Sequence, residues 1–127
     1  MGILKEVGEF SLESQGVTVS EQSCTGGGTV TVDYQGTATG YGVIASTVAF
    51  TVKEAGAKEG TTTANTVAWM ENGDSVAGSG GGVFTTTGLH TWRVRATSFV
   101  SDGTVLITDG EVSLAERTYK GKIYLWE

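Results

Sequence analysis

Two arginines and the aromatic and amide side chains near them are the residues whose types and spacing point most directly to ligand binding. Arg93 and Arg95 stand two positions apart, so they share one face of an extended strand. If the turns at Asn72-Gly73 and Gly88-Leu89 are two-residue hairpin loops, four more side chains share that face. Guanidinium groups beside apolar rings suit an aromatic or carboxylated small molecule. The candidate ligand-binding residues are therefore Asn65, Trp69, Phe84, Arg93, Arg95 and Phe99.

The strand between these two turns contains alternating glycines at Gly78, Gly80 and Gly82. In the same register these three glycines leave a strip without side chains on the arginine face, which we call the glycine lane. The side chain of Trp69 or Phe99, from a diagonal position on a neighbouring strand, would cover the glycine lane. An inward orientation of this face would give a cavity with guanidinium groups in its wall. An outward orientation would leave the arginines in solvent, and the rarity of buried arginine favours it. The core would then contain Trp92, Val94, Val83 and Met70.

His90, the single histidine, follows the second turn and is expected at the rim of the fold. There it could serve as a general acid or base, although an ordinary solvated histidine beside a turn is the more frequent case. A cofactor-free isomerase or cyclase is one alternative function, because such an enzyme needs only an acid or base inside a cavity. The nominees for that role are Arg93, Arg95, Glu116 and Asp33. Because none of these candidates belongs to a recognisable catalytic motif, no residue is predicted to be catalytic.

Motifs for metals and cofactors are missing from the sequence. One cysteine, Cys24, and one histidine cannot build a Cys-only or Cys-His zinc site, and no calcium-loop spacing of acidic residues occurs. The glycine runs lack the Gly-Lys-Ser/Thr of a phosphate loop and the third glycine of a dinucleotide fingerprint. No Gly-x-Ser-x-Gly nucleophile elbow is present either. The sequence therefore predicts neither a metal nor a cofactor.

Length and charge limit the remaining function classes. The 127 residues suffice for one domain, residues 1–127, with a core of its own. A net charge of −6 argues against nucleic-acid and anionic-membrane partners, which require a basic surface. Met1 to Glu6 lacks the apolar core of a signal peptide, and no segment approaches the roughly 20 apolar residues of a membrane span. A cytoplasmic protein is expected.

Alternation of apolar and polar residues predicts an all-β fold, in keeping with 20 glycines, no proline and abundant threonine and valine. Eight or nine short strands with near-regular turns fit a single closed antiparallel barrel of about eight strands, with a two-sheet sandwich as the alternative. Closure would remove edges that no proline protects. The expected strands are 7–12, 17–20, 30–34, 43–53, 65–70, 76–84, 92–99, 104–108, 111–116 and 122–126, with 55–63 as a loop and a turn at Asp109-Gly110.

The segment from Gly78 to Trp92 and the ending Gly121 to Glu127 resemble a family of small uncharacterised prokaryotic β-barrel proteins. The resemblance rests on the alternating glycines, the Thr-x-x-Gly turn and the Thr91-Trp92 pair, and it covers the C-terminal half. That family ends on a Lys-Ile-Trp-Glu-Trp type strand, from which Tyr124-Leu125-Trp126 departs. Its architecture is similar to the calycin-like barrels, lipocalin-like and allene-oxide-cyclase-like, which bind or isomerise apolar molecules. The resemblance implies a barrel and carries over no activity.

Apolar residues on both faces of the central hairpins exceed what one barrel can bury. The surplus predicts a subunit interface or a ligand-binding patch, and a homo-oligomer, dimer or higher, is the simpler expectation. Three functions follow from the sequence. They are a barrel that binds a small apolar, aromatic or carboxylated molecule, the cofactor-free enzyme, and a structural protein that only assembles with itself. The binding barrel is the preferred prediction.

Overall fold

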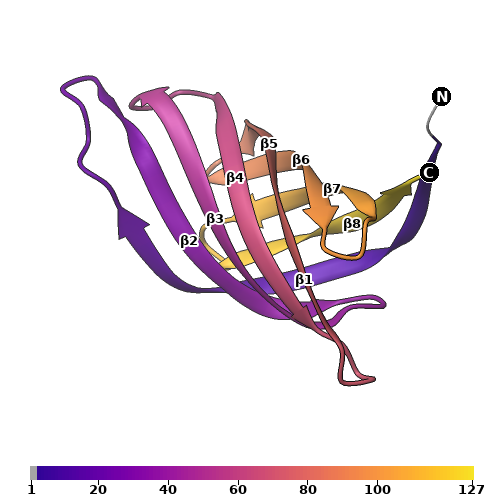
Figure 1. The fold of residues 1–127 in the computed structure, drawn as a ribbon. Coiled ribbons are helices and arrows are strands. Elements are labelled where there is room, and N and C mark those ends of the chain that lie inside the picture. Colours follow the sequence, from indigo (N-terminus) through magenta and orange to yellow (C-terminus); the bar gives the residue numbers. More distant parts are fainter. Residues whose placement is uncertain (1–2) are drawn as a thin grey trace.

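The computed structural model describes residues 3–127. Met1 and Gly2, the first two residues of the segment that lacks signal-peptide features, lie outside the described residues. Figure 1 shows the strands wound around one interior, with the two described chain ends close together. No helix between residues 3 and 127 is long and apolar enough to cross a membrane. The strands are β1 (Leu4–Val19), β2 (Gly26–Ala38), β3 (Gly42–Glu54), β4 (Glu59–Trp69), β5 (Ser75–Gly88), β6 (Thr91–Val100), β7 (Val105–Ser113) and β8 (Thr118–Trp126).

The strands form a closed barrel in which each strand pairs with its neighbours in sequence and β8 pairs with β1. Every pairing is antiparallel. The predicted closed antiparallel barrel is therefore confirmed, and the two-sheet sandwich is wrong. Short turns permit this meander, because antiparallel strands need only a tight connection. Closure gives the backbone of most strands partners on both sides.

Alternation along each strand separates an interior from an outer surface. On β3, Ile44 and Val48 are buried, while Val43 and Thr47 between and beside them are exposed. The same period holds on the other strands because consecutive side chains leave opposite faces of a sheet. All eight strands contribute aliphatic or aromatic residues to the buried core, but β4, β5 and β6 contribute one each. The core residues are Phe10, Leu12, Val32, Tyr34, Ala38, Ile44, Val48, Ala68, Phe84, Val94, Leu106, Val112, Tyr119 and Ile123.

Aromatic rings fill one part of the interior by lying over glycines. The Phe10 and Tyr119 rings meet edge to face at 4.9 Å between centroids. A Cβ on Gly110 would lie 2.8 Å from atoms of both rings, so only glycine leaves room for them. This explains why Asp109-Gly110, expected as a turn, lies inside β7. Glycine here allows close packing against a bent strand instead of a chain reversal.

Two other strand boundaries differ from the expectation. The separate strands predicted at 7–12 and 17–20 form one strand, β1, whose register shifts by a bulge between Ser14 and Gly16. The bulge lets one long strand bend without ending. The loop predicted over 55–63 is shorter, because β4 already begins at Glu59 and pairs there with Thr85 of β5. Cross-strand pairing thus overrides the polar composition of the segment.

Candidate functional site

The β4–β5 turn sets the orientation of the predicted binding residues, and it is longer by one residue than the sequence suggested. The Met70 amide donates to the Asp74 carbonyl, and the Gly73 amide donates to the Met70 carbonyl. Gly73 has φ +93°, so the loop is three residues ending in a left-handed glycine. Trp69 consequently faces Ser75, not Val76. A shift of one residue reverses the face of every side chain on β5 relative to β4.

The β5–β6 turn shows a second one-residue difference. Its loop is Leu89-His90, with His90 at φ 54°, and a bulge between Thr86 and Gly88 adjusts the register. Arg95 therefore faces Val83, where the sequence predicted Gly82. The predicted register of both hairpins is wrong for the same reason. An extra residue in a loop or bulge shifts the pairing by one position, but it does not change the apolar–polar alternation from which the register was predicted.

This correction divides the six candidate residues between the two faces. Phe84 points into the barrel, is 4% exposed and packs edge to face on Phe50 at 5.7 Å between centroids. Trp69 and Phe99 lie on the outer surface, 50% and 61% exposed. The other three outward residues are Asn65, Arg93 and Arg95. The six residues thus do not form one site.

The arginines belong to the outer surface, as the burial argument favoured. Arg93 holds Asp109 through two hydrogen bonds, Nε to Oδ1 at 2.9 Å and Nη2 to Oδ2 at 2.6 Å. The hydrogen bond from Arg93 holds the pKa of the Asp109 carboxyl below its usual range. With the arginines outward, Trp92, Val94, Val83 and Met70 were expected in the core. This prediction is confirmed for buried Val94 and for half-buried Trp92. It is wrong for Val83, which is 48% exposed, and for Met70, which lies in a turn.

The glycine lane faces the interior, on the opposite side from Trp69 and Phe99. A Cβ on Gly80 would collide with the Thr97 carbonyl oxygen, and one on Gly82 with the Arg95 carbonyl oxygen. Neighbouring backbone therefore occupies part of the space that side chains would need, as expected where a strand coils sharply. The remaining space is not filled by Trp69 or Phe99, so the predicted diagonal cover of the lane is wrong.

A cavity lies inside the barrel next to this lane. Its volume is about 130 Å³. Small inward residues on three adjacent strands create it, because each leaves the interior incompletely filled: Ala64 and Ala68 on β4, Gly78 and Gly80 on β5, Ala96 and Ser98 on β6. Larger side chains from the other strands close the opposite wall, chiefly Phe10, Leu12, Ile44, Val48, Leu106, Tyr119 and Ile123, with Tyr41 from the β2–β3 turn.

The cavity wall is apolar with a few neutral hydroxyl groups. Ser46 and Thr66, which face each other across β3 and β4, are hydrogen-bonded at 2.8 Å between their side-chain oxygens. Burial raises the pKa of the Tyr119 hydroxyl to about 12, so this group stays neutral at ordinary pH. No lining residue is Asp, Glu, His, Lys or Arg. A ligand held here meets an uncharged surface.

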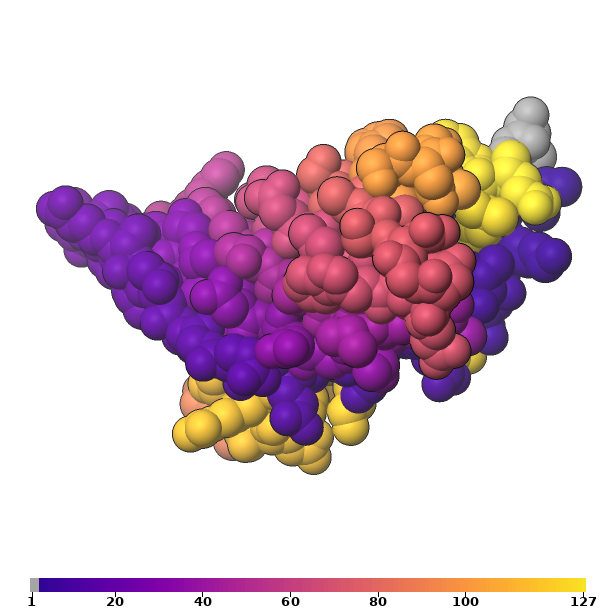
Figure 2. Space-filling view, turned by 60° about the horizontal axis from the view of Figure 1, so that its bottom comes forward, coloured from indigo at the N-terminus to yellow at the C-terminus, as the bar shows by residue number. Residues whose placement is uncertain are grey.

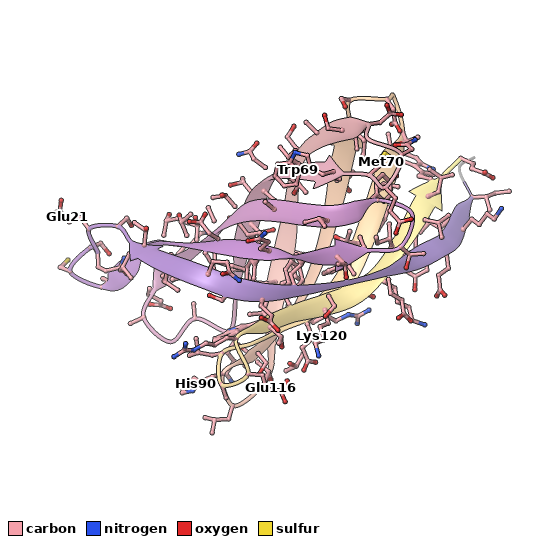
Figure 3. The ribbon with its side chains drawn as sticks, turned by 90° about the horizontal axis from the view of Figure 1, so that it is seen from below. Glu21, Trp69, Met70, His90, Glu116 and Lys120 are labelled. Carbon is pink, nitrogen blue, oxygen red and sulfur yellow. The ribbon has the colours of Figure 1, made fainter. Side chains whose placement is uncertain are left out.

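The proposed acids and bases of the enzyme alternative lie away from this cavity. Asp33 is exposed on the outer face, where it accepts a hydrogen bond from Thr47 Oγ1 at 2.8 Å. Glu116 is exposed in the β7–β8 turn, and Figure 3 shows it beside His90 at the end of the barrel remote from Trp69. His90 occupies the rim as predicted, with its ring stacked on Trp92 at 6.4 Å, and it does not line the cavity.

The sequence already held a signal for this cavity. Ala64, Gly80 and Ser98 stand in one cross-strand row, between Val48 and Leu106. Three small inward residues in a row indicate a void, but the row can be assembled only when both hairpin registers are known. Between residues 3 and 127 no group of three or more metal-binding side chains occurs.

Comparison of the chain with protein-family models, with curated proteins and with solved structures gives no match. The barrel implied by the resemblance is present, while membership of the calycin-like or uncharacterised families stays a prediction.

Proposed function

We propose that this protein is a binding barrel for a small apolar or aromatic molecule, which occupies the interior cavity beside β4, β5 and β6. The observation that supports the proposal most is the apolar wall of this cavity together with its volume of about 130 Å³. Apolar cavities of about 150 Å³ stay dry and accept benzene or xenon. The expected ligand therefore has about six to eight non-hydrogen atoms.

The chemistry of the wall narrows the ligand class. A carboxylate in this cavity would lose its hydration without gaining a cation, because both arginines of the candidate set are on the outer surface. A neutral ligand avoids that cost. The Ser46 and Thr66 hydroxyl groups offer one place where a single polar atom of a ligand could be satisfied. The carboxylated ligands considered from the sequence are thus less favoured than apolar or aromatic ones.

The cofactor-free enzyme has less support than the binding barrel. General acid–base catalysis requires a titratable group within hydrogen-bond reach of the substrate. The cavity wall supplies only hydroxyl groups, and burial raises the pKa of one of them, that of Tyr119, to about 12. Neutral phenols of such high pKa are poor proton acceptors at neutral pH. We therefore propose binding without catalysis.

Thermal unfolding with benzene as the probe tests the proposal. Benzene at about ten times its dissociation constant should stabilise the fold by about 1.4 kcal/mol, which corresponds to a rise in Tm of about 4 °C. Ala64→Leu fills the cavity from β4 and should abolish this rise. Ala49→Leu is the matched control, because Ala49 points outward from β3, and it should retain the rise.

Two outcomes would contradict the proposal. One is no rise in Tm with benzene in the unsubstituted protein, and the other is an equal rise in the Ala64→Leu variant. Ala96→Val, a smaller filling of the same cavity from β6, serves as a second variant if Ala64→Leu impairs folding. Native mass spectrometry of protein purified directly from cells would then identify a retained natural ligand by its excess mass, lost on denaturation.

A further inference from the structure

The outer surface of the barrel is divided into a charged part and a nearly uncharged part. The five cross-strand rows on the outside of β2 to β5 contain a single charged residue, Asp33. We call this surface the β2–β5 face; its rows are Thr37–Val43–Trp69–Ser75, Gln35–Ala45–Val67–Ala77, Asp33–Thr47–Asn65–Ser79, Thr31–Ala49–Thr63–Gly81 and Thr29–Thr51–Thr61–Val83. Figure 2 shows the N-terminal half of the chain, coloured indigo to magenta, spread over one broad face.

The remaining outer surface carries charges of both signs. On it Arg93 pairs with Asp109, and Lys122 lies 3.3 Å from Glu6. Other exposed charged residues on β1, β6, β7 and β8 are Lys5, Glu9, Glu13, Arg95, Glu111 and Lys120. On β3 and β4 the exposed charged residues Lys53, Glu54 and Glu59 lie at one end, beyond the five rows, so the rows themselves form a patch depleted of charge. Surfaces that stay in water normally mix charges throughout, whereas the centres of protein interfaces are depleted of them.

Large apolar side chains project from or beside the β2–β5 face. Trp69 is 50% exposed, Val67 37% and Val43 44%, and Phe99 of β6 stands at the border with 61% exposed. Next to them the surface is hollowed over about 810 Å³, with a floor of small side chains that includes Ala45, Ala77 and Ser79. Projecting rings beside a shallow hollow are self-complementary, because in a two-fold arrangement each copy can place its ring in the hollow of the other.

We infer that the β2–β5 face is the surface through which two copies of this chain associate. Four strands at about 4.8 Å and five rows at about 6.7 Å give roughly 630 Å² on each copy. Two copies would then bury roughly 1,300 Å², which falls within the ~1,200–2,000 Å² of specific interfaces. Without a partner, the Val43, Val67 and Trp69 side chains on this face would stay 37–50% exposed to water.

Charge favours a second copy at this face over any other part of the surface. Each chain carries a net charge of −6, so two copies repel each other wherever their acidic residues meet. The β2–β5 face brings together only the two Asp33 carboxylates, each already hydrogen-bonded by Thr47. A basic partner would instead require acidic side chains on this face. The inference is independent of the interior ligand proposed above.

Sedimentation velocity over about 1–100 µM protein, with matched substitutions, tests the inference. The unsubstituted chain, of 13.2 kDa, should sediment as a two-chain species at the upper end of this range. Ser79→Glu places a carboxylate in the middle of the face and should weaken association at least tenfold. Thr118→Glu introduces the same charge on the outside of β8, which β1 separates from β2, and should leave association unchanged.

Asn65→Asp provides a second test that keeps the side-chain shape and adds charge next to Ser79. Asn65 and Ser79 are both exposed in the single chain, so neither variant should lose the barrel, which far-ultraviolet circular dichroism would verify. The inference is overturned if the unsubstituted chain stays at 13.2 kDa at 100 µM. It is overturned equally if both face variants associate as tightly as the unsubstituted chain.

Discussion

At the residue scale, the glycines of this barrel differ sharply in what they do. Gly82 lies where the carbonyl of Arg95 and the Cα of Ala96 approach the strand, so a side chain has no room. Gly16 follows the bulge in β1 with nothing within 4 Å of the position that a Cβ would take. Composition alone treats these two glycines as equivalent. Their surroundings predict opposite responses to the same substitution.

Gly82→Ala should lower the free energy of unfolding by about 2 kcal/mol or more, because backbone of β6 must move to admit the new methyl group. Gly16→Ala should change it by less than about 1 kcal/mol, and in the stabilising direction, because alanine restricts the unfolded chain. Urea unfolding of both variants at equal concentration measures the difference. Equal destabilisation by the two substitutions would mean that Gly82 is not sterically constrained.

At the element scale, β1 extends well beyond its pairing with one of its two neighbours, β8. It pairs with β2 as far as Val19, but its pairing with β8 ends at Glu13. Figure 1 shows β1 and β2 extending beyond the short strands of the C-terminal half. On this extension Val17 and Val19 are 56% and 61% exposed. The barrel is thus closed over most of its height, but at one end the edge of β1 that faces away from β2 has no partner strand among the described residues.

Amide hydrogen exchange should reveal this open edge. The Ser20 amide donates to Thr29, so by alternation the Thr18 amide points to β2 and those of Val17 and Val19 point to the open side. Val17 and Val19 should therefore exchange quickly, while Thr18 between them is protected. Residue-resolved exchange by NMR measures this pattern. Uniform protection from Gly16 to Val19 would show that another strand covers the edge.

At the scale of the whole molecule, the titratable groups buried among residues 3–127 are two tyrosines. Tyr34 and Tyr119 are 4% and 7% exposed, with ring centroids 5.5 Å apart. Burial raises the pKa of both hydroxyl groups, that of Tyr119 to about 12. Because both rings lie between strands from both halves of the chain, we expect their hydroxyl groups to ionise only when the barrel opens. Their ionisation is therefore coupled to global unfolding.

Stability should accordingly fall at alkaline pH. A group whose pKa is raised by folding contributes stability below its unfolded pKa of about 10, and that contribution is lost as the pH rises through the folded pKa. Between about pH 10 and 12 each buried tyrosine should remove about 1.4 kcal/mol per pH unit. Tyr119→Phe should make the pH dependence shallower. Urea unfolding at pH 8 to 11.5, with absorbance at 295 nm to follow ionisation, provides the measurement.

Tyr124→Phe is the control for this experiment, because Tyr124 faces outward and is only half-buried on β8. Its substitution should leave the slope of stability against pH unchanged. If the tyrosine absorbance of the unsubstituted protein changed fully near pH 10, before the loss of the barrel circular dichroism signal, then Tyr34 and Tyr119 would be accessible in the folded state. That result would contradict the coupling of their ionisation to global unfolding.

Local pattern by itself determined the class of fold and the inward faces of the N-terminal strands, although ten alternating segments form eight strands in the structure. Val30, Val32 and Tyr34 alternate with polar residues, as do Ile44 and Val48, and the structure places all five inward. A single polar face makes the register of such strands unambiguous. The outward orientation of Arg93 and Arg95 likewise followed from the cost of burying a guanidinium group.

Only the tertiary structure decided which residues surround the interior space. The central hairpins carry apolar residues on both faces, so hydrophobicity could not choose between their registers. One extra residue in the β4–β5 loop and one in the bulge of β5 each shifted the predicted pairing by one position. Gly78 and Gly80 therefore border a cavity, while Trp69 and Phe99 lie outside it. A cavity is the space left when side chains from all strands meet. Its position depends on register and closure, which are long-range properties that no local stretch of the sequence encodes.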